Sequence, residues 1–180
     1  TSYIHEQMRE GDRVRLAGPY GRFFVRKSAT ENVLLLAGGT GLSSIKSMLI
    51  DLLEDESQAG KSITLVYGAR DRGELYYDDL LRELAHRHER FTYVPALSEV
   101  KEQDDWSGAT GFVHDVAREH FDGDFRGHKA YMCGPPVMID ACITTLMQGR
   151  LFERDMFMER FFSAADSAQN IRKSPLFKSI

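Results

Sequence analysis

The stretch Val33-Leu34-Leu35-Leu36-Ala37-Gly38-Gly39-Thr40-Gly41-Leu42-Ser43-Ser44 decides the fold. Its apolar run is typical of a strand that is buried on both faces. Two glycines break the run, and an amphipathic helix follows with its apolar residues at Ile45, Met48, Leu49, Leu52 and Leu53. This order puts free backbone N–H groups and the positive helix end where open α/β sheets bind phosphates. The turn lacks Gly-x-Gly-x-x-Gly spacing and a P-loop lysine, so the alternative is a plain strand-to-helix turn.

Composition limits the classes of function. The 180 residues suffice for one domain with a full core, and 42% apolar with 28% charged residues is ordinary for a globular protein. A net charge of −4 gives no basic stripe for nucleic acid. Cys133 and Cys142 are the two cysteines, so a disulfide scaffold, a zinc site and a Cys-ligated cluster are not expected. Without a signal peptide or a long apolar run, we expect a cytoplasmic protein that does not insert into membranes.

The two ends of the chain differ from its middle. The chain starts at Thr1 within an amphipathic pattern, and we expect a piece of a longer polypeptide. After a short helical turn, Val14–Ala17 and Phe23–Val25 alternate as strands do, and we expect residues 1–27 to be the last strands of a β-barrel. Residues 28–162 carry the α/β pattern. Residues 163–180 lose all periodicity, and we expect a flexible tail.

The middle of the chain alternates strands with helices. Such alternation predicts an α/β fold with a five-stranded, parallel, doubly wound sheet and right-handed crossovers. The polar stretch 104–111 is expected to be a loop. The expected strands are 33–37, 63–67, 91–96, 129–132 and 155–158, and the expected helices carry apolar faces at 45–53, 80–85, 113–117 and 138–146.

Four segments that follow the strands share one rim of such a sheet, namely 38–41, 67–70, 96–98 and 133–136. Their glycines let a ligand approach the backbone, Arg70 offers a charged fork, Ser98 a hydroxyl and Cys133 a polarizable side chain. Together they suit an extended anionic ligand with an aromatic head, such as a dinucleotide. The histidines have no metal-ligand spacing and are expected to be structural or solvated: His5, His86, His88, His114, His120 and His128.

Five motifs in order resemble the nicotinamide half of the ferredoxin–NADP reductase superfamily. They are Gly-Pro-Tyr-Gly-Arg-Phe-Phe (18–24), Gly-Gly-Thr-Gly-Leu (38–42), Tyr-Gly-Ala-Arg (67–70), Cys-Gly-Pro-Pro-x-Met (133–138) and Glu-Arg-Phe (159–161). The ending 150–166 resembles reductase components of bacterial multicomponent oxygenases of the phenol hydroxylase type. The loop 105–112 also resembles the flavin subunit of sodium-pumping NADH:quinone reductases, and this alternative stays open, as does a non-catalytic dinucleotide-binding module.

The resemblance implies a nicotinamide dinucleotide site. Gly38, Gly39, Thr40 and Gly41 match the loop that holds the pyrophosphate, although Thr40 alone could be a helix N-cap. Arg70 matches a position near the adenosine ribose. The acidic residues that follow it, Asp71 and Glu74, favour NADH over NADPH because a carboxylate repels a 2′-phosphate. Ser98 belongs to the same rim of the sheet. Either Arg70 or Arg72 could reverse the preference for NADH over NADPH. Three residues would wall the nicotinamide side: Gly134, Pro135 and Met138.

The resemblance also implies catalytic and flavin-facing residues. Cys133 matches a cysteine near nicotinamide C4 that shapes the geometry of hydride transfer, although it could be only a small buried residue. Glu159 would orient the reacting partners, and Phe161 would shield the flavin ring of FAD or only cap the core. Thr1 or Ser2 matches a hydroxyl beside the flavin pyrophosphate.

The implied reaction is hydride transfer from NADH to FAD, followed by electron transfer through a [2Fe–2S] centre to an oxygenase. The cluster would lie in a ferredoxin domain or a partner, because no cluster cysteines occur here. FAD would belong to an FAD-binding barrel that is mostly outside residues 1–27, and we expect this chain to hold FAD weakly. The expected partners are an oxygenase component or a ferredoxin domain.

Overall fold

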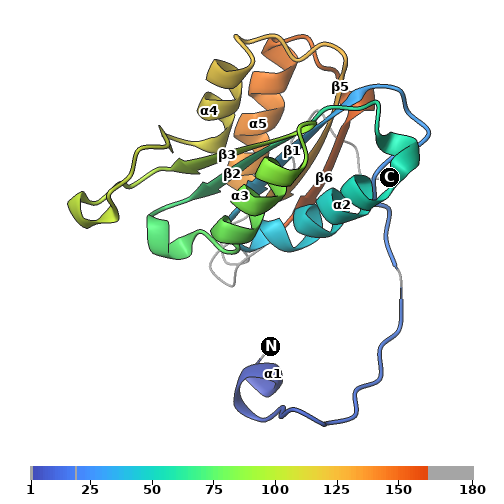
Figure 1. Ribbon diagram of the computed structural model, residues 1–180, viewed down its shortest axis with the longest axis vertical. Helices are drawn as coiled ribbons and strands as arrows, with labels where there is room; N and C mark the ends of the chain where they lie inside the picture. The colour runs from blue at the N-terminus through green and yellow to red at the C-terminus, as the bar shows by residue number, and fades with distance from the viewer. Residues whose placement is uncertain (1, 19, 162–180) are drawn as a thin grey trace.

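The computed structural model describes residues 2–18 and 20–161 and forms an α/β sandwich around one parallel sheet (Figure 1). The strand order is β4-β3-β2-β1-β5-β6, with every neighbouring pair parallel. The strands are β1 Asn32–Gly38, β2 Ile63–Ala69, β3 Phe91–Leu97, β4 Ala109–Thr110, β5 His128–Gly134 and β6 Met156–Arg160.

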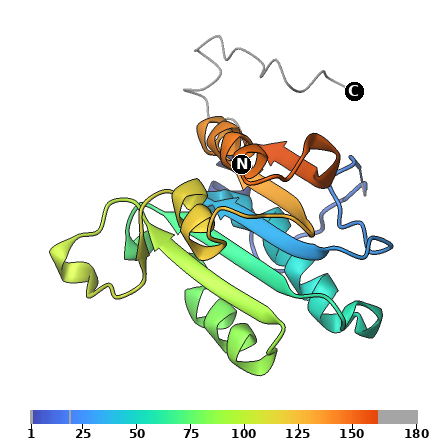
Figure 2. The same ribbon diagram turned by 90° about the horizontal axis from the view of Figure 1, so that it is seen from above.

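Helices cover both faces of the sheet, as the view from above shows (Figure 2). Helices α2 and α3 pack on one face, and α4 and α5 pack on the other. The helices are α1 Ser2–Glu6, α2 Leu42–Glu54, α3 Asp78–Arg87, α4 Val113–His120 and α5 Pro136–Gln148. The predicted apolar faces of the four later helices are therefore confirmed.

Strand β1 lies at the centre of the molecule because both of its faces and both of its edges are covered. Leu35 points into the cluster beneath α2 and α3, whereas Leu34 and Leu36 point into the cluster beneath α4 and α5. All three side chains are fully buried. This explains why the strand is a continuous apolar run rather than an alternating one.

The sheet has one strand more than the five expected. Ala109 and Thr110 pair with Ala96 and Leu97 as the short edge strand β4, within the stretch expected to be a loop. A strand of two residues carries no alternation that a sequence pattern could reveal. The other five strands and the parallel arrangement agree with the expectation.

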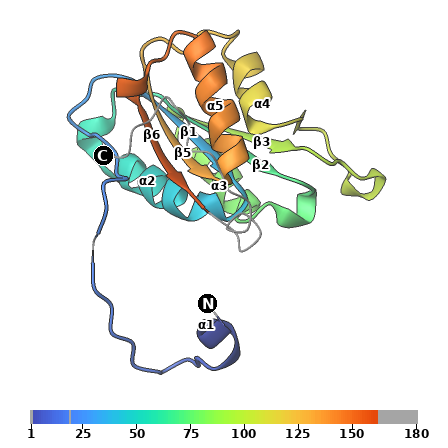
Figure 3. The ribbon, with the colours of Figure 1, turned by 180° about the vertical axis from the view of Figure 1, so that it is seen from behind.

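The N-terminal segment differs from the expectation. The described part of residues 2–31 contains helix α1 and no strand, so the strands expected at Val14–Ala17 and Phe23–Val25 are not formed (Figures 1 and 3). Residues 2–18 are all exposed. Two short antiparallel strands are only marginally stable without further strands to pair with. Whether residues 1–27 belong to a barrel stays a prediction, and Thr1 and the stretch 163–180 lie outside the described residues.

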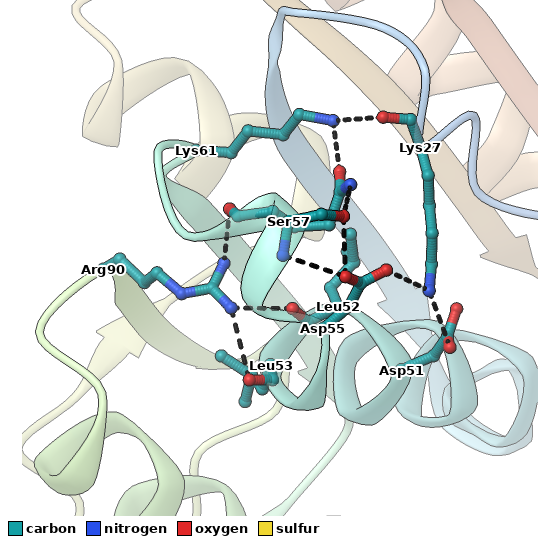
Figure 4. Close-up of polar contacts among 9 residues, drawn as sticks. Lys27, Asp51, Leu52, Leu53, Asp55, Ser57, Lys61 and Arg90 are labelled. Carbon is teal, nitrogen blue, oxygen red and sulfur yellow. Dashed lines mark hydrogen bonds and ion pairs between the residues drawn. The ribbon is translucent and has the colours of Figure 1, made fainter.

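Residues 23–27 nevertheless pack against the α/β body. Phe23 and Val25 contact the cluster beneath α2 and α3, and the backbone N–H of Arg26 donates to the hydroxyl of Tyr131 at 2.8 Å. Figure 4 shows the Lys27 ammonium between the carboxylates of Asp51 and Asp55, at 2.9 and 2.8 Å. This segment is thereby fixed to the last turn of α2.

The same corner of the molecule closes the end of α2. The Arg90 guanidinium donates to the carbonyl oxygens of Leu52 and Leu53, and Lys61 donates to the carbonyl of Lys27 (Figure 4). The contacts from Arg90 satisfy carbonyls that have no partner within the helix. Among the described residues, no helix is long and apolar enough to cross a membrane.

Candidate functional site

A cavity of about 430 Å³ opens at the carboxyl ends of the central strands. It lies between the ends of β1, β2 and β3 and the starts of α4 and α5, which is where open α/β sheets bind ligands. Its lining is mostly apolar and glycine-rich: Gly38, Gly39, Gly68, Ala69, Arg70, Glu74, Ser98, Gly111, Phe112, Val113, His114, Pro135, Val137, Met138 and Ala141.

Close packing explains three glycines at and beside the floor of this cavity. A Cβ at Gly41 would lie 2.2 Å from the Cys133 carbonyl oxygen, and a Cβ at Gly38 would lie 2.5 Å from the sulfur of Met138. Likewise, a Cβ at Gly68 would meet the Val113 side chain at 2.4 Å. The absence of these side chains lets the strand ends and the helix starts meet.

Gly39 has a different role from Gly38 and Gly41. Its φ of +53° is a conformation that favours glycine, and a Cβ there would meet nothing within 4 Å. Gly39 therefore presents backbone to the open cavity just before α2 begins. Thr40 is exposed and makes no side-chain cap on α2, because Gly41 occupies the N-cap position. The N-cap alternative for Thr40 is thus wrong.

Two exposed apolar side chains stand on the walls of the cavity. Phe112, just before α4, is 63% exposed, and Val137, in the first turn of α5, is 80% exposed. The Phe112 ring stacks on His114 with centroids 5.9 Å apart and an interplanar angle of 11°. Exposed apolar groups that flank a cavity suit a flat aromatic ligand.

The charged groups near the cavity are already paired. Arg70 Nε donates to a carboxylate oxygen of Glu74 at 3.0 Å, and both residues line the cavity. Asp71 instead forms an ion pair with Lys101, which lowers the pKa of Asp71, and it does not line the cavity. Of the two acidic residues on which the preference for NADH was based, Glu74 is therefore beside the cavity and Asp71 is not.

Cys133, Glu159 and Phe161 come together at the ends of β5 and β6. Cys133 is paired in register with Glu159, and the N–H of Phe161 donates to the carbonyl of Gly134 at 2.9 Å. Ser44, in the first turn of α2, donates from its hydroxyl to the Glu159 carboxylate at 3.3 Å. Burial raises the pKa of the Cys133 thiol to about 11, although the Ser44 hydroxyl acts in the opposite direction. Cys133 is thus a neutral thiol at physiological pH.

Most of the predicted site residues form two groups, whereas Thr40, Gly41 and Asp71 do not line the cavity. Gly38, Gly39, Arg70, Ser98, Pro135 and Met138 line the cavity. Cys133, Glu159 and Phe161 form a neighbouring cluster around β5 and β6 with Gly134. Ser2 is exposed on α1, and Thr1 lies outside the described residues. Among the described residues, no group of His, Cys, Asp or Glu side chains could hold a metal ion.

Seven lining residues outside the four rim segments were not predicted as ligand residues from the sequence: Glu74, Gly111, Phe112, Val113, His114, Val137 and Ala141. Val137 comes three residues after the end of β5, at the start of α5, and this position was a usable signal. Phe112 follows the short strand β4, which no sequence pattern marks. His114 is two residues beyond Phe112, and Glu74 reaches the cavity through a 3-10 turn, Arg72–Glu74, that no periodicity marks.

The parallel sheet and the cavity at its strand ends are those of a dinucleotide-binding α/β domain. The family model described as "Oxidoreductase NAD-binding domain" matches residues 35–143, and the chain belongs to this family. The match contains the glycine turn, the Arg70 segment and the start of α5.

Among curated proteins, the chain is 58% identical over its whole length to the reductase component DmpP of phenol 2-monooxygenase from Pseudomonas sp. strain CF600. It is 52% identical to the phenol hydroxylase P5 protein of Acinetobacter pittii. Each match covers 50% of the relative, so the chain spans half the length of these curated proteins.

More distant matches include a sequence relative and a solved structure. One component of the Na(+)-translocating NADH-quinone reductase of Klebsiella pneumoniae is 35% identical over 89% of this chain and 40% of that protein. The crystal structure of the Amycolatopsis cytochrome P450 reductase GcoB superposes with a TM-score of 0.77 at 28% identity, over 88% of this chain and 46% of that one. The phenol hydroxylase relatives are therefore more similar to this chain than the quinone reductase component.

Proposed function

We propose that this chain is the NADH-binding part of a reductase component of a phenol hydroxylase-type multicomponent monooxygenase. The observation that carries the proposal is the cavity at the carboxyl ends of β1 to β3, joined to the Cys133–Glu159–Phe161 cluster in a chain 58% identical to such a component. A non-catalytic binding module would need the cavity but not the cluster.

The cavity suits the adenosine and pyrophosphate parts of the dinucleotide. Backbone N–H groups and the positive end of α2 favour the pyrophosphate at Gly39–Gly41. The Phe112 ring and Val137 offer apolar surface to the base, and the hydroxyl of Ser98 is available to a ribose. The pairing of Arg70 with Glu74 favours NADH, because a 2′-phosphate would meet the Glu74 carboxylate and would have to displace it from Arg70.

The cluster suits the nicotinamide end. Nicotinamide carries the hydride and a flavin accepts it, so the protein supplies position and excludes water. Cys133 presents a small, neutral thiol at the end of β5, and Glu159 beside it is oriented by the Ser44 hydroxyl. The Phe161 backbone is held on Gly134, which keeps the aromatic residue next to this strand end.

FAD and a [2Fe–2S] centre would complete the electron path. We propose FAD as the hydride acceptor, with Phe161 and the hydroxyl of Thr1 or Ser2 on the flavin side. A [2Fe–2S] centre in a ferredoxin domain or partner would pass single electrons to the oxygenase. Two free, buried thiols support a location in the reducing cytoplasm.

Calorimetric titration of the chain with NADH and with NADPH tests the proposal. We expect NADH to bind in the micromolar to millimolar range and NADPH to bind more weakly. Glu74→Gln should reduce the difference in affinity between NADH and NADPH. Glu83→Gln removes an ion pair with Arg87 on α3 and should leave that difference unchanged. Equal binding of both dinucleotides would contradict the preference for NADH, and binding of neither would contradict the site.

A further inference from the structure

Tyr67 on β2 contacts two loops of the site from the core side of the sheet. Its side chain is fully buried, and its hydroxyl accepts the N–H of Tyr76 at 3.3 Å. The same hydroxyl donates toward the carbonyl oxygens of Gly39, at 3.2 Å, and Glu74, at 3.4 Å. A hydroxyl has one hydrogen, so these two carbonyls share it.

The two residues whose carbonyl oxygens accept from Tyr67 belong to cavity loops assigned to different parts of the ligand. Gly39 is in the glycine turn, and Glu74 is the partner of Arg70. Tyr67 itself does not line the cavity, because its ring packs in the cluster beneath α2 and α3. Any influence of Tyr67 on a ligand therefore passes through these loops.

The contact with Gly39 also orients the glycine turn. In a trans peptide the carbonyl and the following N–H point in opposite directions. Because the Gly39 carbonyl is held by Tyr67 and by the N–H of Leu42, the Thr40 N–H is directed away from Tyr67. A glycine at φ +53° has few steric limits of its own, so an external contact is needed to select one orientation.

We propose that Tyr67 is a positioning residue for the dinucleotide, whose hydroxyl holds the glycine turn and the Arg70–Glu74 loop at a fixed spacing. The proposal rests on the proposed function, because the spacing matters only to a ligand that contacts both loops. Burial raises the pKa of Tyr67 to about 12, so the hydroxyl keeps its hydrogen throughout the neutral range.

The test compares Tyr67→Phe with Tyr131→Phe. Tyr131 is also a buried tyrosine of the same core cluster, but its hydroxyl accepts the Arg26 N–H, away from both cavity loops. Each variant loses one buried hydroxyl and keeps its ring, so both should lose similar stability in thermal unfolding. We expect NADH to bind about three- to tenfold more weakly to Tyr67→Phe, as the loss of a hydrogen bond predicts, and unchanged to Tyr131→Phe.

Amide hydrogen exchange of the wild-type chain gives a second measurement that does not depend on a variant folding. NADH should slow exchange at Tyr76, behind the site, more than at Arg26. Equal NADH affinity of the two variants, or equal protection of the two amides, would overturn the role of Tyr67. A wild-type chain that binds neither NADH nor NADPH would overturn the proposed function and this inference together.

Discussion

Gly41 shows how one residue type couples the glycine turn to the end of β5. An alanine there would place its Cβ 2.2 Å from the Cys133 carbonyl oxygen and 2.8 Å from the Gly134 nitrogen, so backbone atoms would have to move. We expect Gly41→Ala to lower the free energy of unfolding by about 1–3 kcal/mol, the range typical of overpacking. Chemical denaturation measures this change.

The matched control is Gly60→Ala, in an exposed turn where a Cβ meets nothing within 4 Å. This substitution should be neutral, or should raise the unfolding free energy by about 0.4–1 kcal/mol through the unfolded state. Similar changes in unfolding free energy for Gly41→Ala and Gly60→Ala would show that the close contact with Cys133 does not require a glycine at position 41.

Phe112 is the residue through which the adenine end can be tested. Removing its exposed ring by Phe112→Ala should weaken NADH binding by about 1 kcal/mol, the value of an aromatic contact. Reduced nicotinamide mononucleotide, which has no adenosine, should bind the variant and the wild type equally. Phe152→Ala is the control, since Phe152 is 55% exposed but does not line the cavity. Equal losses for both ligands would place the adenine elsewhere.

At the scale of elements, the end of α2 depends on the charge of Asp55. Hydrogen bonds from Lys27 and from Ser57 lower the pKa of Asp55 to about 2 (Figure 4). A carboxyl group with a lowered pKa contributes stability above its unfolded pKa, and this stability is lost as the pH falls toward 2. Asp55→Asn, which can still cap the following turn, should flatten the pH dependence of thermal unfolding between about pH 4 and pH 2. Parallel curves for variant and wild type would contradict this assignment.

The regular elements could be predicted from the sequence because each has a period or a run long enough to read. The apolar run of β1 and the faces of α2 to α5 are such cases, and the structure places them where the pattern does. The short edge strand β4 and the 3-10 turn that carries Glu74 were not predictable, because two or three residues define no period. The strands expected at 14–17 and 23–25 failed because alternation alone does not supply a pairing partner.

The sequence predicted which strand ends lie together, whereas the binding of a dinucleotide by these residues stays a prediction. The strand ends gave Gly38, Gly39, Arg70, Ser98 and Pro135 correctly as neighbours of one cavity. The sequence could not show that Asp71 pairs with Lys101, because these residues are far apart in the chain. Such ion pairs depend on side-chain directions, which only the folded arrangement defines.

At the scale of the whole molecule, the chain divides into a packed body and an exposed N-terminal segment (Figure 3). Residues 2–18 are exposed and contain Arg9, Arg13 and Arg15. Among the described residues, trypsin should therefore cut first at these arginines. The product that begins after Arg15 should keep the cooperative unfolding transition of the uncut chain, as mass spectrometry and calorimetry can check. Earlier cleavage within α2 to α5 would contradict the division.

The central place of β1 also has a consequence for protein synthesis. One edge of β1 pairs with β2, but the other pairs with β5, where Asn32 lies opposite His128. A nascent chain on the ribosome therefore carries an unpaired, apolar strand edge until β5 has emerged from the exit tunnel. Chains that stop between β3 and β5 would expose this edge permanently and should self-associate. The free edge of β1 is thus covered only after β5 has been synthesised.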